Sequence, residues 1–553
     1  MFRKTEEEQM SMFDRYNTAG KQAQVAVNGS RAKLIGDVIY PRIDEEKFSC
    51  LFSDVASRPN ISIRRYVSAS ILKRSYDISE TIMLELLRCG ALNFQYALHT
   101  TNEDEQPLSE SSLRRFRRAV EAYNKEHKCD LIKDEFVRIS RLMAIDMGLL
   151  GKDVDTESGE AGGFIARMDS MEIEAHAKKM TRVEIVYTTI AIVLRYLCKK
   201  GFESIIPESF GHYFDDGDKN RLVYHRGRKD KAEGRKDTRL EECIKEMLLL
   251  KGVLEENFSS DVLKTIPEYD VFQRVLDDQT KTDQDGNIVP KSNGEISAKS
   301  VQNPFDTTAT YRHKKHAYRG YALNVVEAID GKGNGIIIDA DLEPNVTSDA
   351  AMAEAYLERQ PDNGPRQVIS ADGAYDSTRL DELAEQKNIE IQTTALTGAE
   401  PWDIDADFTL NDEGTAVLSC PCGHVPVHNK YNPKTGMIIA HMPNNCCANC
   451  PHANECDTYL NEKKGTSKVH ISKKMVTRAR KARRFGTEEG KANGRQRNGV
   501  EGIMSVMRRK YNIDHLPVFG IERYRLWTWT TLLAYNIAKY QKWLLSQKID
   551  VAA

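Results

Sequence analysis

Three acidic residues stand in stretches that could place them at one catalytic site. Asp169 lies in FIARMDSMEI and Asp372 in QVISADGAYDS, two short apolar runs typical of buried strands. Glu501 lies in RNGVEGIMSVMRR, where apolar residues recur at helical spacing. Carboxylate oxygens are the ligands that Mg²⁺ prefers, and two such ions can stabilise the attacking and leaving oxygens of a phosphodiester. These residues therefore indicate phosphoryl transfer on a nucleic acid.

Other aspartates compete for the same role. Asp339 and Asp341 lie in an expected hairpin, while Asp349 and Asp376 could cap the helices that follow them. Spacing alone does not choose among these residues. A carboxylate at the end of a buried strand is costly unless it is paired or metal-bound, and Asp169 and Asp372 both have such a position.

Six of the eleven cysteines fall between residues 420 and 456. In a chain that we expect to be cytoplasmic, such clustering suggests a metal rather than disulfides. Tetrahedral Zn²⁺ suits the spacing, and a loop-rich segment with little apolar core needs such a staple. Free thiols are the competing interpretation. The predicted ligands of this structural zinc are Cys420, Cys447, Cys450 and Cys456, with Cys422, His424 or Cys446 as substitutes.

Basic residues gather in three segments, although the net charge of the chain is only −3. Between Lys463 and Arg497, thirteen Lys and Arg stand against two Glu. Local positive charge on a nearly neutral protein suits a phosphate backbone, whereas each segment alone could be a solvated helix face. The predicted DNA-binding residues of these segments are Arg114, Arg115, Arg117, Arg118, Lys314, Lys315, Arg478, Arg480, Arg483 and Arg484.

Bulk composition sets the class of protein. A length of 553 residues predicts about two to four domains, and 40% hydrophobic with 29% charged residues is ordinary for a globular protein. No apolar run approaches the length of a membrane span, and MFRKTEEEQM does not resemble a signal peptide. We therefore expect a cytoplasmic protein with no membrane partner.

The elements that must position the acidic residues can be read from periodicity. Residues 1–150 are expected to be helical, and a basic amphipathic helix should begin after Ser109 or Ser111. This outline suits a DNA-reading module, but many helical bundles share it. Residues 151–163 are expected to form a polar joint, and residues 211–237 a mobile connection between helices.

From residue 318 the period changes to that of strands. The run around Asp169 and the segments from residue 318 to 396 give the order strand, hairpin, helix, strand, helix, strand, which predicts a mixed sheet covered by helices. Helices are expected at 498–511 and 522–546. Trp527 and Trp529 in the last of these are expected to pack against the sheet rather than to stack on bases.

Together, these motifs resemble a bacterial insertion-sequence transposase of the DDE type, which has a ribonuclease-H-like core. PLSESSLRRFRRAVEAY resembles its N-terminal transposase-associated domain, and FIARMDSMEIEAHAKK its first catalytic strand. DTTATYRHKKHAYRGYALNVVEAID and VISADGAYDS resemble the strand after the first insertion and the second catalytic strand. Arg497, Glu501 and Arg508 match the arginine, glutamate and basic positions of the third catalytic helix. The resemblance runs from about residue 40 to 545.

The resemblance implies roles for these residues. Asp169, Asp372 and Glu501 would hold two Mg²⁺ ions, with Mn²⁺ as an alternative, and Arg497 and Arg508 would contact DNA phosphates near the cleaved end. Related transposases carry a similar cysteine-rich insert, which supports the zinc prediction. Gly494 stands where the family signature often has tyrosine, and arginine replaces the more frequent lysine at 508. Both departures concern handling of the DNA end rather than metal chemistry.

The expected fold class is α/β. A ribonuclease-H-like mixed sheet would be interrupted by a helical insertion and a cysteine-rich zinc-binding insertion, and preceded by an all-α DNA-binding domain. The expected boundaries are 1–150 for the helical domain that recognises terminal repeats, 160–177 and 304–397 for the two parts of the core, 178–303 for the helical insertion, 398–462 for the cysteine-rich insertion, 463–513 for the basic segment and glutamate helix, and 514–553 for the C-terminal helix.

The function implied by the resemblance is cut-and-paste DNA transposition. Double-stranded DNA would be the partner, as terminal inverted repeats and as target, and a homodimer or larger assembly would handle two ends together. The reaction would take place at the bacterial nucleoid. Two alternatives stay open: a DNA-binding regulator that has lost the chemistry, and a ribonuclease-H-like nuclease that does not transpose.

Overall fold

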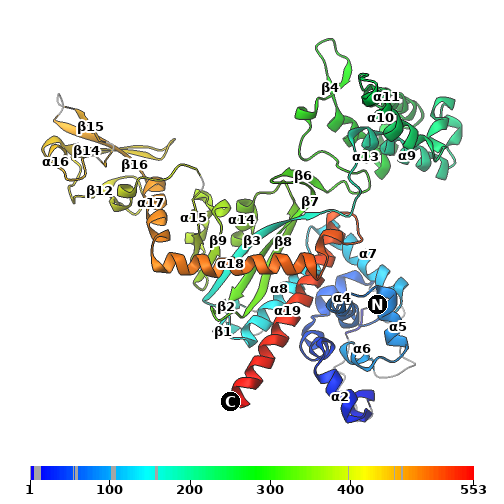
Figure 1. Cartoon of the computed structure of the whole chain (residues 1–553), viewed down its shortest axis with the longest axis horizontal. Coiled ribbons are helices and arrows are strands. Elements are labelled where there is room, and N and C mark those ends of the chain that lie inside the picture. The colour runs from blue at the N-terminus through cyan, green and yellow to red at the C-terminus, as the bar shows by residue number, and fades with distance from the viewer. Residues whose placement is uncertain are drawn as a thin grey trace.

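A mixed six-stranded sheet occupies the centre of the computed structural model, and two lobes project from it (Figure 1). The structure describes residues 2–4, 14–53, 55, 60–100, 108–155, 160–396, 398–453, 455–456, 458–461 and 465–552. The strands of the central sheet are β3 (Phe164–Glu174), β6 (Thr310–His313), β7 (Ala317–Ile329), β8 (Gly335–Pro344), β9 (Gln367–Ala371) and β10 (Ile389–Thr393).

Strand order and register bring distant segments together. The order is β10-β9-β3-β7-β6, with β8 also paired to β7. β3 runs antiparallel to β7 and parallel to β9, and β9 runs parallel to β10. The β7–β8 hairpin turns through Gly331 and Gly333, whose φ angles of 72° and 97° favour glycine. The predicted mixed sheet is confirmed, with β6 as an additional short strand.

Helices pack around the central sheet. Those around the sheet are α8 (Leu131–Asp146), α14 (Asp349–Glu358), α15 (Thr378–Gln386), α18 (Glu488–Arg509) and α19 (Ile521–Ala552). The side chain of Trp529 on α19 is buried, stacks on Phe136 and donates from its indole to the Asp130 carboxylate at 2.6 Å. Trp529 therefore packs in the core, while Trp527 is half-buried beneath the Lys73 ammonium.

The N-terminal helices share one apolar core with the sheet. Buried residues from Ala32 to Tyr540 form a single cluster. Arg74 of α4 also donates to Thr531 Oγ1 of α19 at 2.8 Å. Ser109 caps α7, so the first of the two expected caps is the one used. The N-terminal helices are α1 (Arg15–Thr18), α2 (Lys21–Asn28), α3 (Arg31–Leu34), α4 (Ile63–Tyr76), α5 (Glu80–Arg88), α6 (Leu92–Ala97) and α7 (Glu110–His127), with shorter turns η1 (Ile35–Ile39), η2 (Tyr40–Arg42) and η3 (Glu46–Leu51).

The helical insertion after β3 has its own apolar core and projects from the sheet (Figure 1). Residues 211–237 are largely helical there, which corrects the expected mobile connection. Their charges are compensated locally, as in the pair of Arg226 with Glu242 at 2.5 Å. The elements are α9 (Arg182–Lys199), η4 (Glu203–Ile205), η5 (Glu208–Phe214), η6 (Asn220–Arg226), α10 (Gly227–Ala232), α11 (Arg239–Asn257), α12 (Ser260–Lys264), α13 (Pro267–Gln279), β4 (Thr280–Thr282), β5 (Ile288–Pro290) and η7 (Asn293–Glu295).

A small hairpin replaces the expected polar joint before β3. Its strands are β1 (Gly151–Asp155) and β2 (Glu160–Gly162), which pair antiparallel. Residues 156–159 between them lie outside the described residues. The backbone N–H and C=O groups of these strands are hydrogen-bonded to each other, although the polar, glycine-rich composition predicted an irregular loop.

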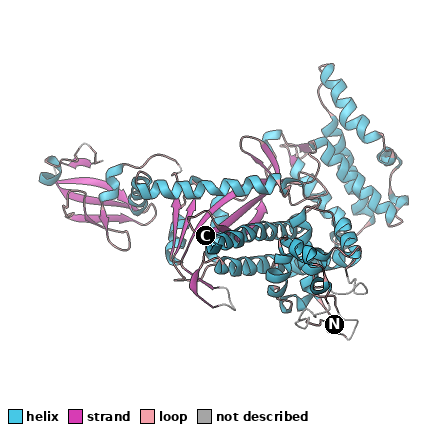
Figure 2. Ribbon diagram, turned by 60° about the horizontal axis from the view of Figure 1, so that its bottom comes forward, coloured by secondary structure: helices cyan, strands magenta, loops and turns pink. Residues whose placement is uncertain are grey.

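The cysteine-rich lobe is a second, smaller sheet at the far end of α18 (Figure 2). Its four main strands have the order β13-β14-β16-β15, and apolar side chains such as Ile438 and Ile471 form a separate core. Part of the expected basic segment forms strand β16. The elements are η9 (Asp403–Asp407), β11 (Thr409–Leu410), β12 (Val417–Ser419), β13 (His428–Asn432), β14 (Met437–Pro443), α16 (Asn444–Ala448), β15 (Thr458–Asn461), β16 (Thr466–Ser472) and α17 (Lys473–Phe485).

Two short 3₁₀ turns complete the chain, η8 (Gly373–Tyr375) after β9 and η11 (Ile513–His515) after α18. Within the described residues, every helix is too short or too polar to cross a membrane.

Candidate active site

The three predicted carboxylates come from three elements of the core. Asp169 lies within β3, Asp372 follows the last residue of β9, and Glu501 lies on α18. Because β3 and β9 are parallel neighbours, with Arg167 paired to Ser370, the two aspartates reach the same level of the sheet. The long helix α18 crosses beside β3 and β9 (Figure 1).

Arg497 joins the two aspartates. Its Nη2 lies 3.2 Å from Asp169 Oδ2 and 3.8 Å from Asp372 Oδ2. The backbone N–H of Ser170 donates to Asp169 Oδ1, and that of Ala374 donates to Asp372 Oδ1, both at 2.8 Å. Burial raises the pKa of Asp169, an effect that the Ser170 N–H and the Arg497 guanidinium oppose. One positive group thus holds the two carboxylates together.

Glu501 and Asp169 face a common open cleft. Glu501 follows Arg497 by four residues and therefore lies on the same side of the helix. Glu501 is exposed, whereas the Asp169 side chain is largely buried at the floor. The cleft encloses about 790 Å³ and is lined by Asp169, Ser170, Met171, Glu172, Lys314, Lys315, His316, Tyr318, Glu501, Met504, Ser505, Arg508 and Arg509.

The chemical type of the donors, rather than their spacing in this structure, fits a hard divalent cation. Two carboxylates converge on one cationic side chain and a third lines the same cleft, which is the oxygen-rich set that Mg²⁺ takes. Among the residues that the structure describes, no group of three or more His, Cys, Asp or Glu side chains is close enough to hold a metal ion. The guanidinium of Arg497 lies between the aspartates, and Glu501 stands apart from them.

Part of the predicted DNA-binding set lies at this cleft. Lys314 and Lys315 lie at its edge beside Glu172, to which Lys314 pairs at 2.9 Å. Arg508 donates to the backbone oxygen of Glu172 at 2.7 Å and pairs with Asp514 at 3.0 Å. The cleft therefore combines acidic residues at its floor with lysine and arginine at its edge.

The arginines of α7 lie elsewhere. Arg114, Arg117 and Arg118 line a separate cavity of about 230 Å³ together with Arg523 and Trp527. Arg117 pairs with Glu80 at 2.6 Å, whereas Arg114, Arg115 and Arg118 are exposed. Any contact that these residues make with DNA is therefore away from the acidic cleft.

The predicted DNA-binding arginines of α17 are occupied within the protein. They tie the helix to the segment before the cysteine-rich lobe and to the core, and so fix the start of α18. Their contacts are Arg478 with Asp376, Arg480 with the carbonyl oxygens of Ala406 and Phe408, Arg483 with Asp403 and Asp407, and Arg484 with Glu390. A basic run in the sequence is here largely an internal ion-pair network.

Sequence reasoning missed several residues of the cleft. Arg509, His316 and Tyr318 line it but were not predicted, although Arg509 adjoins Arg508 and the other two belong to the basic run HKKHAYR. Glu172 was also missed. Its buried side chain lines the same cleft as Asp169 and pairs with Arg312 at 3.2 Å.

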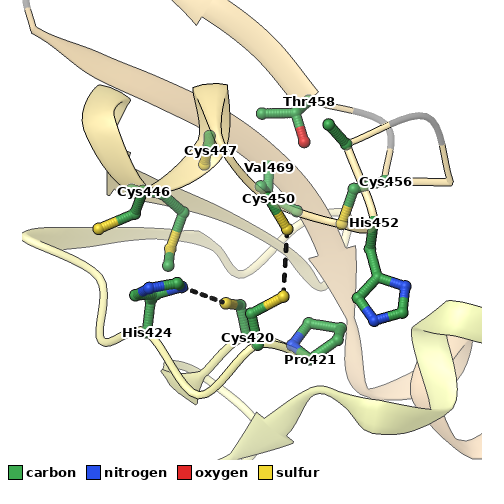
Figure 3. Close-up of a pocket in the computed structure, with 13 residues that line it drawn as sticks. Cys420, Pro421, His424, Cys446, Cys447, Cys450, His452, Cys456, Thr458 and Val469 are labelled. Atoms are coloured by element: carbon green, nitrogen blue, oxygen red, sulfur yellow. Dashed lines mark hydrogen bonds between the residues drawn. The ribbon is translucent and has the colours of Figure 1, made fainter.

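The six clustered cysteines surround one cavity of about 70 Å³ (Figure 3). Cys422 Sγ lies 3.1 Å from Cys450 Sγ, and Cys420 Sγ lies 3.8 Å from His424 Nδ1. A hydrogen bond with Cys450 raises the pKa of Cys422 to about 11, and burial raises that of Cys456 to about 11. All predicted zinc ligands and all their substitutes line this cavity. Thiolate and imidazole donors fit Zn²⁺.

His452 also lines this cavity, although sequence reasoning passed over it. Its position between Cys450 and Cys456 in the sequence was the available signal. Its Nδ1 lies 2.8 Å from Glu455 Oε2, so its other ring nitrogen is the one available to a ligand.

Comparison with known proteins points to one class. Residues 419–541 match a family described as a transposase DDE domain. The matched segment includes the cysteine cluster, Arg497 and Glu501, while Asp169 and Asp372 lie before it. No curated protein and no solved structure matches the chain. The match supports a DNA transposase of the DDE class, an enzyme that acts on DNA, and the mixed α/β architecture fits that class.

Proposed function

We propose that this protein cleaves phosphodiester bonds at transposon ends and joins the freed 3′-hydroxyl to target DNA. Asp169, Asp372 and Glu501 would hold two Mg²⁺ ions, with Mn²⁺ as an alternative. The observation that carries the proposal is the approach of Asp169 and Asp372 to one Arg497 nitrogen, beside the cleft that Glu501 also lines. The two aspartates are far apart in the sequence, and both form an ion pair with the same guanidinium.

In this proposal the acidic residues bind metal ions and the basic residues at the edge of the cleft bind DNA. When bound, the metal ions would activate water and neutralise charge on the phosphodiester oxygens. Asp169 would provide oxygen ligands from β3, which pairs with β7 and β9. Asp372 would do so from the turn after β9, where the Ala374 N–H holds its carboxylate. Lys314, Lys315 and Arg508 supply positive charge at the edge, where it attracts the DNA backbone without reading its sequence.

Further parts of the proposal concern the assembly. Residues 1–150 would recognise terminal inverted repeats in double-stranded DNA, and a homodimer or larger complex would bring two ends together. The substrate would place the protein at the bacterial nucleoid. We also propose that the cysteine cluster binds one structural Zn²⁺ through Cys420, Cys447, Cys450 and Cys456, or with Cys422, His424 or Cys446 in one of these places. A ribonuclease-H-like topology for the core belongs to the same proposal.

An excision assay tests the chemistry. A plasmid carrying the inverted repeats that flank the gene is incubated with the purified chain in Mg²⁺ or in EDTA. Asp372→Asn should reduce cleavage by more than about 100-fold, since loss of an outer-shell metal partner alone costs 10–100-fold. Asp412→Asn, on the exposed surface of the cysteine-rich lobe, is the matched control and should cleave as the wild type does. Equal cleavage by the Asp372→Asn variant and the wild type would reject the site.

A joining assay separates transposition from simple nuclease action. A pre-cut duplex with a free 3′-hydroxyl is supplied with supercoiled target plasmid, and joined products are counted. Cleavage without joining would favour a nuclease. Absence of both reactions, with retained binding to the repeats, would favour a regulator.

A further inference from the structure

A buried ion pair lies two residues before Asp169 on β3. Arg167 faces Glu327 of β7 directly across the antiparallel pairing. Both Nε and Nη2 of Arg167 lie 2.5 Å from Glu327 Oε2, and the Glu327 side chain has no exposed surface. A carboxylate removed from water in this way needs its cation, because an unpaired buried charge is strongly destabilising. The pair therefore fixes the position of the Arg167 guanidinium.

The third nitrogen of this guanidinium reaches the glutamate helix. Arg167 Nη1 donates to the backbone oxygen of Gln496 on α18 at 2.8 Å. Gln496 immediately precedes Arg497, and Arg167 and Asp169 lie on the same face of β3 because side chains alternate along a strand. One face of β3 thus presents both a predicted metal ligand and a hydrogen bond to the helix that carries another.

Gly499 allows the helix to approach so closely. A Cβ atom at this position would lie 1.8 Å from Arg167 Nη1 and 2.7 Å from its Cζ. Arginine tips usually move aside at little cost, but this one is held by Glu327. Two other glycines of α18, Gly494 and Gly502, would place a Cβ with no atom within 4 Å. Only the middle glycine of the three faces the guanidinium.

Apolar packing alone does not set the position of α18. Val500, Ile503 and Met507 are buried side chains of α18 itself. Their apolar contacts are non-directional. A hydrogen bond from a fixed guanidinium to one carbonyl oxygen is directional, so it constrains the height and the register of the helix near Gln496, as the bond from Arg508 to the Glu172 backbone oxygen does further along.

We propose that Arg167 is a positioning residue, which, held by Glu327 and seated against Gly499, sets the distance from α18 to β3 and so places Glu501 and Arg497 relative to Asp169. The proposal rests on the proposed function, because the carboxylates must meet to share metal ions. It acts through the helix and requires no contact of Arg167 with DNA. The competing role is stabilisation of the sheet alone.

Arg167→Lys separates these two roles. Lysine keeps a positive charge beside Glu327. Its single ammonium cannot also donate to the Gln496 oxygen, which the arginine reaches with a separate nitrogen of its forked guanidinium. We expect a melting temperature close to that of the wild type, faster hydrogen exchange in peptides covering residues 495–507, and about 100-fold slower cleavage, the loss expected from a misplacement of about 1 Å. Unchanged exchange and cleavage would overturn the proposal.

Gly499→Ala provides an independent test that leaves both charges in place. It should also speed exchange in α18 and slow cleavage, whereas Gly502→Ala, with open space at its Cβ, should do neither. The double variant Arg167→Lys/Gly499→Ala should be no worse than Arg167→Lys alone, because both changes disturb one contact. Fully additive losses would overturn the proposal. Should Arg167→Lys not fold, Gly499→Ala tests the same contact alone.

The two proposals fail in different ways. If the wild-type chain cleaves no DNA, the proposed function fails. The hydrogen-exchange rates of the single and double variants would still show whether Arg167 and Gly499 position α18 through one contact. If the wild type cleaves and neither variant alters exchange in residues 495–507, the positioning role fails and the proposed function stands.

Discussion

Arg497 compensates two negative charges that the fold brings side by side. Its Nη2 is within 4 Å of both Asp169 and Asp372, and its Nε is buried without a hydrogen-bond partner among the residues that the structure describes. Two neighbouring carboxylates repel each other unless a cation lies between them. The arginine therefore occupies an electrostatic position for which a divalent ion would compete.

Removal of this guanidinium should favour cation binding. For Arg497→Met we expect Mn²⁺ affinity to rise by about 10-fold, because a positive charge within about 4 Å of the aspartates is lost. Isothermal titration calorimetry without DNA measures this affinity. Arg366→Met, which removes an exposed arginine that pairs with Glu390, serves as the control. Weaker Mn²⁺ binding by Arg497→Met would contradict this account.

Lys73 gives a pH-dependent contribution to stability. Burial lowers its pKa from 10.5 to about 8, an effect that Glu80 at 3.6 Å opposes. Between these values the unfolded chain binds more protons than the folded one, so the stability that this group contributes rises with pH, and the cost of burying its charge is present in full below pH 8. The slope is at most about 1.4 kcal/mol per pH unit.

Lys73→Met should therefore stabilise the protein most near pH 7. The difference in melting temperature between this variant and the wild type should shrink as the pH rises toward 10. Thermal unfolding at pH 7, 8.5 and 10 measures it. A difference that is constant across this range would show that the Lys73 charge is not penalised in the folded state.

At the scale of elements, the strands of the core were the most predictable feature. β7, β8 and β9 are apolar runs bounded by glycine, asparagine or aspartate, so local sequence is enough to locate them. The helical character of residues 220–232 was not predictable, since it depends on ion pairs such as Arg226 with Glu242. The N-terminal extension of α18 to Glu488 was missed because its first half is polar and contains Gly490 and Gly494.

For the candidate site, local sequence could indicate which carboxylates to consider but not how they meet. Asp169 and Asp372 were chosen because each lies in an apolar run. The contact of Arg497 with both, and the partners of the α17 arginines, depend on residues about 80 to 330 positions away. Such pairing is set by tertiary packing, and a basic run in sequence looks the same whether its charges face DNA or neighbouring carboxylates.

The stability of the cysteine-rich lobe should depend on the proposed Zn²⁺ ion. Its own core is small and separate from that of the sheet, so few apolar contacts oppose its unfolding. We expect about one Zn²⁺ per chain by elemental analysis. Its removal by chelator should expose residues 417–472 to protease and leave β3 and β7 protected.

Two serine variants control this experiment. Cys450→Ser should lose the zinc, whereas Cys50→Ser, an exposed cysteine outside the cluster, should retain it. A lobe that resists protease after complete chelation would exclude a structural metal.

At the scale of the whole molecule, the cysteine-rich lobe and the helical insertion project on opposite sides of the central sheet (Figures 1 and 2). The acidic cleft is lined by residues of β3 and α18. DNA affinity should depend on the charges at that cleft rather than on all basic segments. Lys315→Gln should lower the slope of log K against log salt concentration by about 0.9, the value for one phosphate contact.

Arg483→Gln is the informative contrast, because its guanidinium already pairs with Asp403 and Asp407. Its slope should equal that of the wild type. Fluorescence anisotropy with a duplex at several salt concentrations measures both variants. A larger change for Arg483→Gln than for Lys315→Gln would indicate that α17 exchanges its internal partners for DNA.

The single core shared by the N-terminal helices and the sheet has a geometric consequence. Because these helices and the sheet belong to one core, N-terminal helices bound to a terminal repeat could not rotate relative to the catalytic cleft. The distance along the duplex between the repeat and the cleaved bond would then be fixed. Insertion of about five base pairs between repeat and cut site, half a turn of B-DNA, would carry the bond to the opposite side of the double helix. Excision should then stop, and about ten inserted base pairs should restore part of it.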